Sequence, residues 1–334
     1  MKNANPAPVG VTRGVHCLRR HFLVGATPSA SGSRRQALAL MCGAGSWLPR
    51  AMGADDGAPL RLAFSETVVG DVNLNDARVA MRMWMKRMAQ DMNLAVEYDP
   101  QVFETTQEIL SRARKGLLDA VALNVIEYRQ IADLLDSSNV IASAGVEGPE
   151  RYVILVKQGG AIERLSDLRG RRLILLQAPR MCVATAWLSA ILEEGHFGPS
   201  EQFLGSVATE PKVSRVVLPV FFGQAEACLT SKRGFDAMCE LNPQVAKDLK
   251  ALAISPAMVV TFYVFRKNYQ GVFRDRLVKA LAGLRNTAAG RQFATLFQFE
   301  EAVVKDAGCL APALAVLDAA DRAHARRGAG GRKG

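Results

Sequence analysis

The sequence predicts an α/β protein of two lobes, each with a mixed, mostly parallel sheet and flanking helices, and a ligand cleft between the lobes. Three observations predict this fold. Short apolar segments alternate with amphipathic segments, the strand-like segments fall into two sets, and two extended crossings join the sets. With 334 residues and 49% hydrophobic content, the chain can bury a core in each lobe.

The first 54 residues have the pattern of an export signal. Ser33 is followed by the pair Arg34-Arg35, a short apolar run over 37–48, and small residues up to Ala54. This order is typical of a secretory signal peptide, and the arginine pair resembles the twin-arginine kind. We therefore expect cleavage near Ala54 and a mature protein in the periplasm. The alternative is an N-terminal arm that is retained.

The net charge of +10 is concentrated at the two ends of the chain. Residues 1–54 contain seven basic and no acidic residues, and residues 322–334 contain five basic and no acidic ones, which leaves −2 for the rest. A nucleic-acid footprint needs Lys and Arg clustered on a folded face. The sequence therefore predicts no nucleic-acid partner, and it predicts that the basic, glycine-rich tail over 322–334 is disordered.

The first set of elements alternates strand, helix, strand, helix, strand. The expected segments are, in order, 60–64, 76–92, 94–98, 104–115 and 118–123. Strand–helix–strand units of this kind give parallel strands joined by right-handed crossovers. Together with the chain that returns near the C-terminus, they predict a first lobe over 55–153 and 259–321.

A second set of strands begins at Tyr152. Strands are expected at 152–156, 172–176, 216–218 and 227–229, with helices over 182–194 and 231–240. The segment 254–265 is expected to be a strand that leads back to the first set, and the chain after Val272 is expected to be helical. The second lobe is therefore assigned to residues 154–258.

Histidine and cysteine usage argues against catalysis and against a metal site. After removal of the leader only His196 and His324 remain, so histidine-based triads and histidine-rich metal sites are not expected. The four remaining cysteines show no C-x-x-C spacing. They are Cys182, Cys228, Cys239 and Cys309. One disulfide or four buried thiols are both compatible with the sequence, and no cofactor is predicted.

Four segments in the second half of the chain carry a family resemblance. They are VKQGGAIERLSDLRGRRLILLQAP, LSAILEEGHFGP, FFGQAEACLTSKRGFDAMCELNPQV and AISPAMVVTFYVFRKNY. This combination resembles the phosphate/phosphite/phosphonate-type substrate-binding proteins of ABC transporters, which have the type 2 periplasmic binding protein fold. The resemblance implies a monomeric, extracytoplasmic solute-binding protein of an uptake system, with a membrane permease as its partner and a small molecule as its ligand.

The turn at 177–183 departs from the family pattern. In the family this turn carries Ser and Thr hydroxyls that hold the phosphonate, whereas this chain has Arg180-Met181-Cys182-Val183. Loss of each charge-assisted hydrogen bond removes about 1.5–3 kcal/mol. The expected ligand is therefore a small anionic or zwitterionic organic solute. Arg180 can pair with an anion of the ligand, or it can be a solvated surface residue.

Other candidate ligand-binding residues lie beside predicted strands. By resemblance, Glu226 stands where the family has an aspartate that can meet a ligand amine. Polar residues that follow the strands of the first lobe, and residues of the turn, complete the set. The predicted ligand-binding residues are Ser65, Glu66, Asn124, Tyr128, Gln177, Arg180, Met181, Cys182 and Glu226. No catalytic residue is predicted.

Two other functions fit the same fold. A periplasmic sensing module would use the same lobe closure to signal to a membrane partner such as a sensor kinase. A two-carboxylate enzyme would need Glu66 and Glu226 to face each other across the cleft. Recognition of a solute remains the favoured interpretation.

Overall fold

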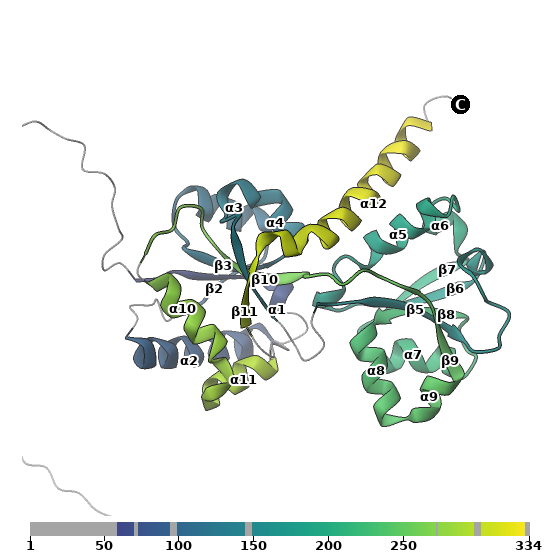
Figure 1. The fold of residues 1–334 in the computed structure, drawn as a ribbon, viewed down its shortest axis with the longest axis horizontal. Coiled ribbons are helices and arrows are strands. Elements are labelled where there is room, and N and C mark those ends of the chain that lie inside the picture. The colour runs from purple at the N-terminus through teal and green to yellow at the C-terminus, as the bar shows by residue number, and fades with distance from the viewer. Residues whose placement is uncertain are drawn as a thin grey trace, which may run out of the picture. The chain divides into compact units, whose positions relative to one another are not determined.

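The computed structural model contains two mixed sheets, each flanked by helices (Figure 1). It describes residues 59–69, 73–93, 99–143, 149–271, 273–296 and 302–330. The predicted export signal over 1–54 and the predicted strand at 94–98 lie outside the described residues.

The first sheet has the strand order β11-β4-β10-β3-β1-β2. Its strands are β1 (Leu62–Ser65), β2 (Gln101–Phe103), β3 (Ala120–Asn124), β4 (Asn139–Ser143), β10 (Thr261–Phe265) and β11 (Ala302–Asp306). Strand β1 pairs in parallel with β2 and β3, whereas β10 runs antiparallel to β3 and places Thr261 opposite Asn124. The carboxyl ends of β1 and β3 therefore lie at the edge where β10 begins.

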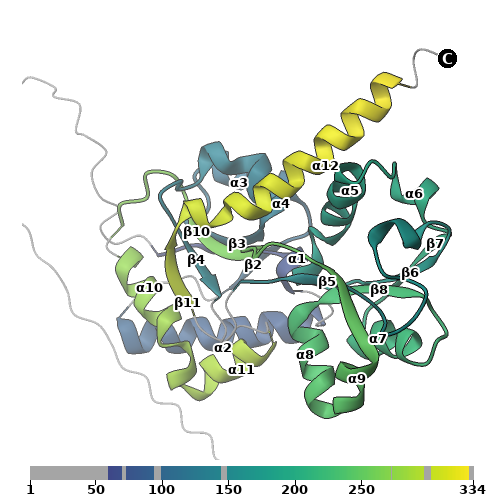
Figure 2. The ribbon, with the colours of Figure 1, turned by 45° about the vertical axis from the view of Figure 1, so that its right-hand side comes forward.

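Helices cover both faces of the first sheet (Figure 2). One face packs against α2 (Leu74–Met92), α10 (Phe273–Ala282) and α11 (Ala288–Leu296), and the other against α3 (Thr106–Arg114) and α4 (Val125–Ile131). Alternate residues of a strand point to opposite faces. Phe64, Ala122 and Tyr263 accordingly belong to the core under α2, α10 and α11, whereas Ala63 and Val121 belong to the other core.

The second sheet has the order β7-β6-β8-β5-β9. Its strands are β5 (Tyr152–Lys157), β6 (Arg172–Leu176), β7 (Ser206–Glu210), β8 (Ala227–Ser231) and β9 (Leu249–Ile254). Helices α5 and α6 lie on one face and α7, α8 and α9 on the other (Figures 1 and 2). These helices are α5 (Ala184–Glu194), α6 (Ser200–Phe203), α7 (Val213–Phe221), α8 (Lys232–Leu241) and α9 (Pro243–Asp248). Strands β6, β7 and β8 are parallel, and β5 runs antiparallel to β8 and β9.

Short helical segments occupy the ends of several strands. They are α1 (Glu66–Val69), η1 (Ala132–Leu134), η2 (Leu165–Leu168), η3 (Pro179–Met181), η4 (Leu284–Asn286) and η5 (Ala307–Leu310). Segment α1 follows β1 directly, and η3 follows β6 just before α5. Both therefore lie at the carboxyl ends of parallel strands, where open α/β sheets bind ligands.

The two crossings between the sheets pair with each other. Glu150 N donates to Met258 O at 2.9 Å, and Met258 N donates to Glu150 O at 2.8 Å. Glu150 lies two residues before β5, and Met258 lies between β9 and β10. The strands of the second sheet all fall between Tyr152 and Ile254, and the exact lobe limits at 153/154 and 258/259 stay a prediction.

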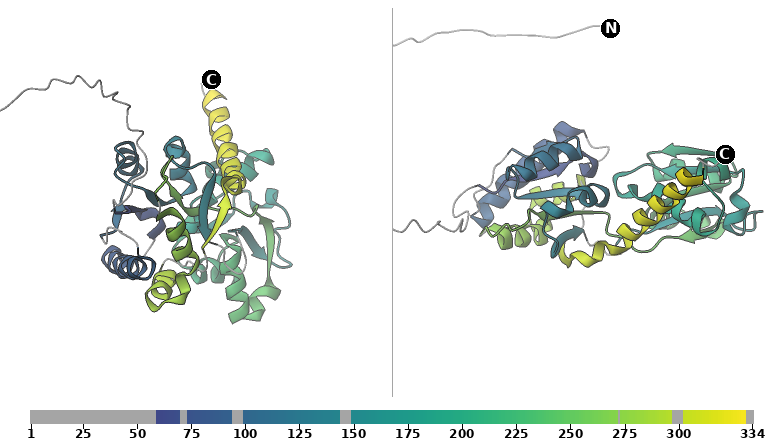
Figure 3. Two further views of the ribbon diagram at one scale, coloured as in Figure 1. Left: turned by 60° about the vertical axis from the view of Figure 1, so that its left-hand side comes forward. Right: turned by 90° about the horizontal axis from the view of Figure 1, so that it is seen from above.

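Helix α12 (Ala311–Gly330) forms a third link between the sheets (Figure 3). It contacts η5 and α4 on the first sheet and α5 on the second. Arg129 of α4 pairs with Asp321 at 2.8 Å, and Arg326 pairs with Glu193 of α5 at 3.2 Å. The expectation of disorder from Arg322 onward is wrong as far as Gly330, because these residues continue helix α12.

Three other expectations in the second half of the chain are wrong. Residues 216–218 lie in helix α7, because the apolar residues there repeat with helical spacing and bury Val216, Val217 and Val220. The segment 254–265 is not one strand, since β9 ends at Ile254 and β10 begins at Thr261. The chain after Val272 is not wholly helical, because β11 pairs with β4.

Within the described residues, no helix is long and apolar enough to cross a membrane. The same part of the chain contains no cluster of three or more residues suited to hold a metal ion. Cys182, Cys228, Cys239 and Cys309 are all free thiols, so the disulfide left open by the sequence is absent among them.

Candidate functional site

A buried carboxylate organises the polar edge of the first sheet. Glu127 is 4% exposed. Its carboxylate accepts hydrogen bonds from Ser65 Oγ at 2.5 Å, Thr67 Oγ1 at 3.0 Å and Asn124 N at 3.0 Å. Ser65 ends β1 and Asn124 ends β3, which are neighbouring parallel strands, so the sheet itself brings these side chains together.

The local sequence explains why Glu127 points back to this edge. Asn124 caps α4 and accepts hydrogen bonds from the N–H groups of Ile126 and Glu127, while Glu127 returns to Asn124 N in a reciprocal capping box. The hydroxyl hydrogens of Ser65 and Thr67 are donated to Glu127. This edge therefore presents oxygen lone pairs backed by a negative charge, which suits a hydrogen-bond donor better than an anion.

Tyr152, the first residue of β5, holds the turn after β6 in place. Tyr152 is fully buried, and its hydroxyl donates to Arg180 O at 2.7 Å. Burial, with smaller contributions from Cys182 and Glu150, raises the pKa of Tyr152 well above its usual value, so the hydroxyl remains a neutral donor. The turn is thus anchored at the residue that the sequence singled out for anion binding.

Arg180 is paired with a carboxylate of the same chain. Its Nη1 lies 2.7 Å from Glu150 Oε1, and the two side chains are 18% and 10% exposed. Glu150 and Tyr152 are two residues apart in an extended segment and therefore point to the same side. Glu150 pairs with the side chain of Arg180, and Tyr152 donates to its carbonyl oxygen. Arg180 is therefore an ion-paired, largely buried residue and not a solvated surface residue.

The neighbouring residues of the turn form an apolar wall. Met181 is buried, and the thiol of Cys182 lies 4.0 Å from Val260 O in the returning crossing. Burial, together with the negative charges of Glu127 and Glu150, raises the pKa of Cys182 to about 12. The thiol is therefore neutral and unreactive at ordinary pH.

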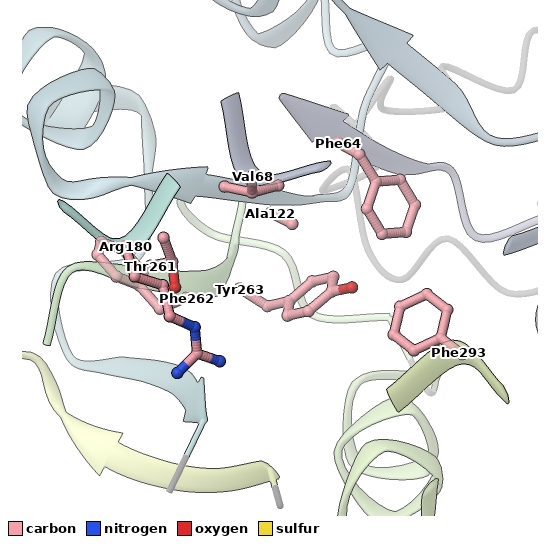
Figure 4. Close-up of a pocket in the computed structure, with 8 residues that line it drawn as sticks. All are labelled: Phe64, Val68, Ala122, Arg180, Thr261, Phe262, Tyr263 and Phe293. Carbon is pink, nitrogen blue, oxygen red and sulfur yellow. The ribbon is translucent and has the colours of Figure 1, made fainter. Parts of the chain in front are cut away.

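An aromatic cavity opens beside Arg180 (Figure 4). It has a volume of about 40 Å³ and is lined by Phe64, Val68, Ala122, Arg180, Thr261, Phe262, Tyr263 and Phe293. Ala122 pairs in register with Phe64 on β1 and with Tyr263 on β10. The small side chain of Ala122 leaves room between the two larger ones, whose rings meet edge to face with centroids 5.7 Å apart. The cavity suits the apolar part of a small organic molecule.

Arg180 stands between this cavity and a smaller one. Figure 4 shows the guanidinium group turned away from the rings of Phe64, Tyr263 and Phe293. On that side a cavity of about 10 Å³ is lined by Glu150, Ser143 and the crossing over 258–261. The hydroxyl oxygen of Ser143 is buried there without a hydrogen-bond partner among the described residues.

The structure brings together most, but not all, of the predicted site residues. Ser65 and Asn124 share the Glu127 network, and Glu66 begins α1 beside them. Gln177 is exposed after β6, and its N–H donates to Glu210 O. Tyr128 borders neither cavity described above: it packs edge to face on Phe262 with centroids 5.3 Å apart. Burial raises the pKa of Tyr128, and the nearby Asp136 and Cys309 raise it further.

The predicted role of Glu226 in the cleft is wrong. Glu226 precedes β8, which is parallel to β6 and places Ala227 beside Leu173, near the start of β6. Its carboxylate accepts a hydrogen bond from Arg172 N at 3.3 Å. The turn that contains Arg180 follows the other end of β6, so the length of a strand separates the two residues. Glu226 instead lines a separate hollow of about 200 Å³, and the two-carboxylate arrangement with Glu66 is not formed.

Two important residues were missed in the sequence. Glu150 pairs with Arg180 in the turn, and Glu127 accepts the hydrogen bonds that organise the polar edge of the first sheet. The Asn-x-x-Glu spacing at 124–127 is a capping-box signal that indicates Glu127. No local signal marks Glu150, because its partner Arg180 lies 30 residues further along the chain.

Comparison with known proteins identifies a matching family. The family model described as "ABC transporter, phosphonate, periplasmic substrate-binding protein" matches residues 72–307. No curated protein matched the chain in a sequence search.

Several solved structures have a similar fold. A binding protein component of an ABC phosphonate transporter from Pseudomonas aeruginosa has a TM-score of 0.52 at 13% identity, with 80% of this chain and 88% of that chain covered. A Xanthomonas citri protein bound to ATP has a TM-score of 0.57 at 12% identity, covering 80% and 98%. PhnD1 from Prochlorococcus marinus in complex with methylphosphonate has a TM-score of 0.50 at 14% identity, covering 75% and 94%. At these identities the likeness shows a shared fold.

Proposed function

We propose a solute class and a mode of binding for this chain from the premise that it belongs to the periplasmic substrate-binding proteins of phosphonate ABC transporters. Members of this family bind a small molecule in the periplasm and present it to a membrane permease. The matched region, 72–307, contains every strand of both sheets except β1, which precedes it. The remaining question is which solute the cavity beside Arg180 accepts.

We propose that the solute is a small organic monoanion or zwitterion. The observation that carries this proposal is the position of Arg180, which lines an aromatic cavity while it is paired with Glu150. The apolar part of the solute would lie against Phe64 and Tyr263, and its anionic group would approach Arg180. An ammonium group, if present, would meet the oxygen lone pairs of the Ser65–Glu127 network.

Three features of the site disfavour a phosphonate dianion. The turn over 177–183 has no side-chain hydroxyl, the charge of Arg180 is already balanced by Glu150, and Glu127 adds a negative charge on the first sheet. Phosphonate binding of the family's usual kind relies on hydroxyl and charged donors. A monoanion needs fewer such donors and experiences less repulsion from the two carboxylates.

Thermal unfolding in the presence of candidate solutes tests the proposal. The mature protein would be screened against phosphonates, sulfonates, carboxylates and amino acids, since a solute at 100 times its Kd adds about 2.7 kcal/mol of stability. Calorimetry with the solute found in the screen would then compare Arg180→Ala with Glu226→Gln. We expect Arg180→Ala to weaken binding by about 2–5 kcal/mol. Glu226→Gln is the control, because Glu226 lies at the far end of β6; equal affinities in both variants would refute the site.

We also propose that export depends on Arg34-Arg35 and that the mature chain begins near Asp55. The arginine pair and the apolar run after it support the twin-arginine route. Replacing both arginines by lysine should retain the precursor in the cytoplasm, and N-terminal sequencing of the periplasmic form should begin near Asp55. Undiminished export of the double variant would refute the route. We expect the mature protein to sediment as a monomer.

A further inference from the structure

Glu150 occupies an unusual position for a carboxylate in a protein that captures anions. It lies in one of the two crossings between the sheets, where its main chain pairs with Met258 of the other crossing. Its side chain reaches Arg180 in the turn after β6 at 2.7 Å. The cation nearest to the aromatic cavity therefore has a permanent negative partner built into the crossing.

This arrangement changes what the cavity can attract. The pair is largely buried, with side chains 18% and 10% exposed, so solvent screens it only partly. An anion that reaches the guanidinium group comes within several ångströms of Glu150 as well. The attraction to Arg180 is then offset by repulsion from Glu150. Both energies double when the anion carries two charges instead of one, so Glu150 removes much of the gain in affinity that the second charge would otherwise bring.

We infer that Glu150 determines the charge selectivity of the site: it lowers the affinity for dianions such as phosphonates more strongly than the affinity for monoanions such as sulfonates and carboxylates. This inference rests on the proposed function, because it requires the anionic group of the solute to face Arg180. A second carboxylate supports it. Burial and, after it, the negative charge of Glu127 raise the pKa of Cys182 in the turn.

The size of the effect follows from the separation of charges. One additional unit of negative charge at about 5 Å from Glu150, in an effective dielectric of about 20, lowers affinity by about 300-fold before any compensation by Arg180. Removing the charge of Glu150 should therefore shift the ratio of the two affinities toward the dianion by tenfold or more.

Methylphosphonate and methanesulfonate provide the matched pair of probes. Both are tetrahedral and carry one methyl group, and at about pH 8.5 the phosphonate is mainly a dianion whereas the sulfonate is a monoanion. Calorimetric titrations would be performed with the wild type, Glu150→Gln and Glu226→Gln. Glutamine keeps an oxygen that can accept from Arg180 but removes the charge. Glu226→Gln removes one negative charge at the other end of the second sheet.

We expect Glu150→Gln to raise the affinity for methylphosphonate at least tenfold more than the affinity for methanesulfonate, whereas Glu226→Gln changes neither. An unchanged ratio of the two affinities in Glu150→Gln overturns the inference, and so does the absence of methylphosphonate binding to that variant. If Glu150→Gln unfolds, Glu150→Asp keeps the charge and should keep the wild-type ratio; a ratio that shifts toward methylphosphonate in Glu150→Asp overturns the inference equally.

The proposed function fails in a different way. If Arg180→Ala binds the solute found by screening as tightly as the wild type does, the anion does not face Arg180 and the site itself is wrong. If Arg180→Ala loses binding but Glu150→Gln keeps the wild-type selectivity, the site stands and only the role of Glu150 is refuted.

Discussion

Replacing Tyr152 by Phe removes one oxygen atom from the support of the turn that contains Arg180. Tyr152 is fully buried, and its hydroxyl donates to Arg180 O at 2.7 Å. The ring contacts, including the tilted contact with Trp187 at a centroid separation of 6.3 Å, are the same for Phe. The substitution therefore tests a single hydrogen bond.

The expected loss is about 1–2 kcal/mol of unfolding free energy. A hydrogen bond of this kind contributes about 1 kcal/mol, and leaving the partner carbonyl unsatisfied adds a desolvation cost of similar size. Phe fills nearly the same volume as Tyr, so the cavity contribution is small. Because the pKa of Tyr152 is raised well above its usual value, the hydroxyl stays protonated and the loss should be the same from about pH 6 to pH 9.

Urea unfolding followed by tryptophan fluorescence would measure this loss. Trp84 is buried in the first sheet's core and Trp187 is buried beside the second sheet, so both parts contribute to the signal. Tyr128→Phe is a matched control, because the Tyr128 ring is 7% exposed and its hydroxyl has no hydrogen bond to another described residue. We expect that control to remain within about 0.5 kcal/mol of the wild type. If both variants unfold alike, the hydroxyl of Tyr152 does not support the turn.

Three other substitutions test the core and the cavity. Asp119→Ala removes three hydrogen bonds from Arg61 to a carboxylate that is 2% exposed and should cost about 3 kcal/mol in urea unfolding; a loss below about 1 kcal/mol would contradict the argument. Burial raises the pKa of Cys228 to about 12, so the unfolded chain releases this proton first and the free energy of unfolding should fall as pH rises from about 9 to 12. Unfolding curves over that range should show a shallower fall for Cys228→Ala, and equal slopes would refute the assignment. Ala122→Val should fill the aromatic cavity and weaken binding of the screened solute at least tenfold, while thermal unfolding shows a folded protein; unchanged affinity would place the solute elsewhere.

The sequence predicted most of the strands whose residues are buried, although not β4, and it missed strands at the edges of the sheets. Strand β3 is buried throughout, and its apolar run is plain in the sequence. Strands β7 and β11 are edge strands in which exposed and half-buried residues predominate, so they lack an apolar run. Residues 216–218 were assigned to a strand because three apolar residues alone cannot distinguish a strand from a buried turn of helix.

The sequence predicted which residues lie together where position along a strand decides it, and it missed contacts between partners that are distant in sequence. The turn with Arg180 follows from a strand that runs into a helix, and Ser65 and Asn124 follow from the ends of parallel strands. Glu150 contacts Arg180 only because the crossing passes over the turn. No periodic pattern in the sequence indicates this contact. Glu226 was placed wrongly because it precedes its strand, and parallel strands bring together residues that follow them.

Helix α12 makes solute capture depend on a segment that contacts neither cavity. Its 20 residues form a helix about 30 Å long, which is held by Arg129 near its middle and by Glu193 toward its C-terminal end. If solute binding changes the distance between α4 and α5, helix α12 must slide, tilt or detach from one of them. The free energy that this movement costs reduces the free energy of solute binding by the same amount. A tag fused to the C-terminus, or a deletion there, would therefore alter apparent affinity at a distance, through a mechanical load rather than through any group that touches the solute.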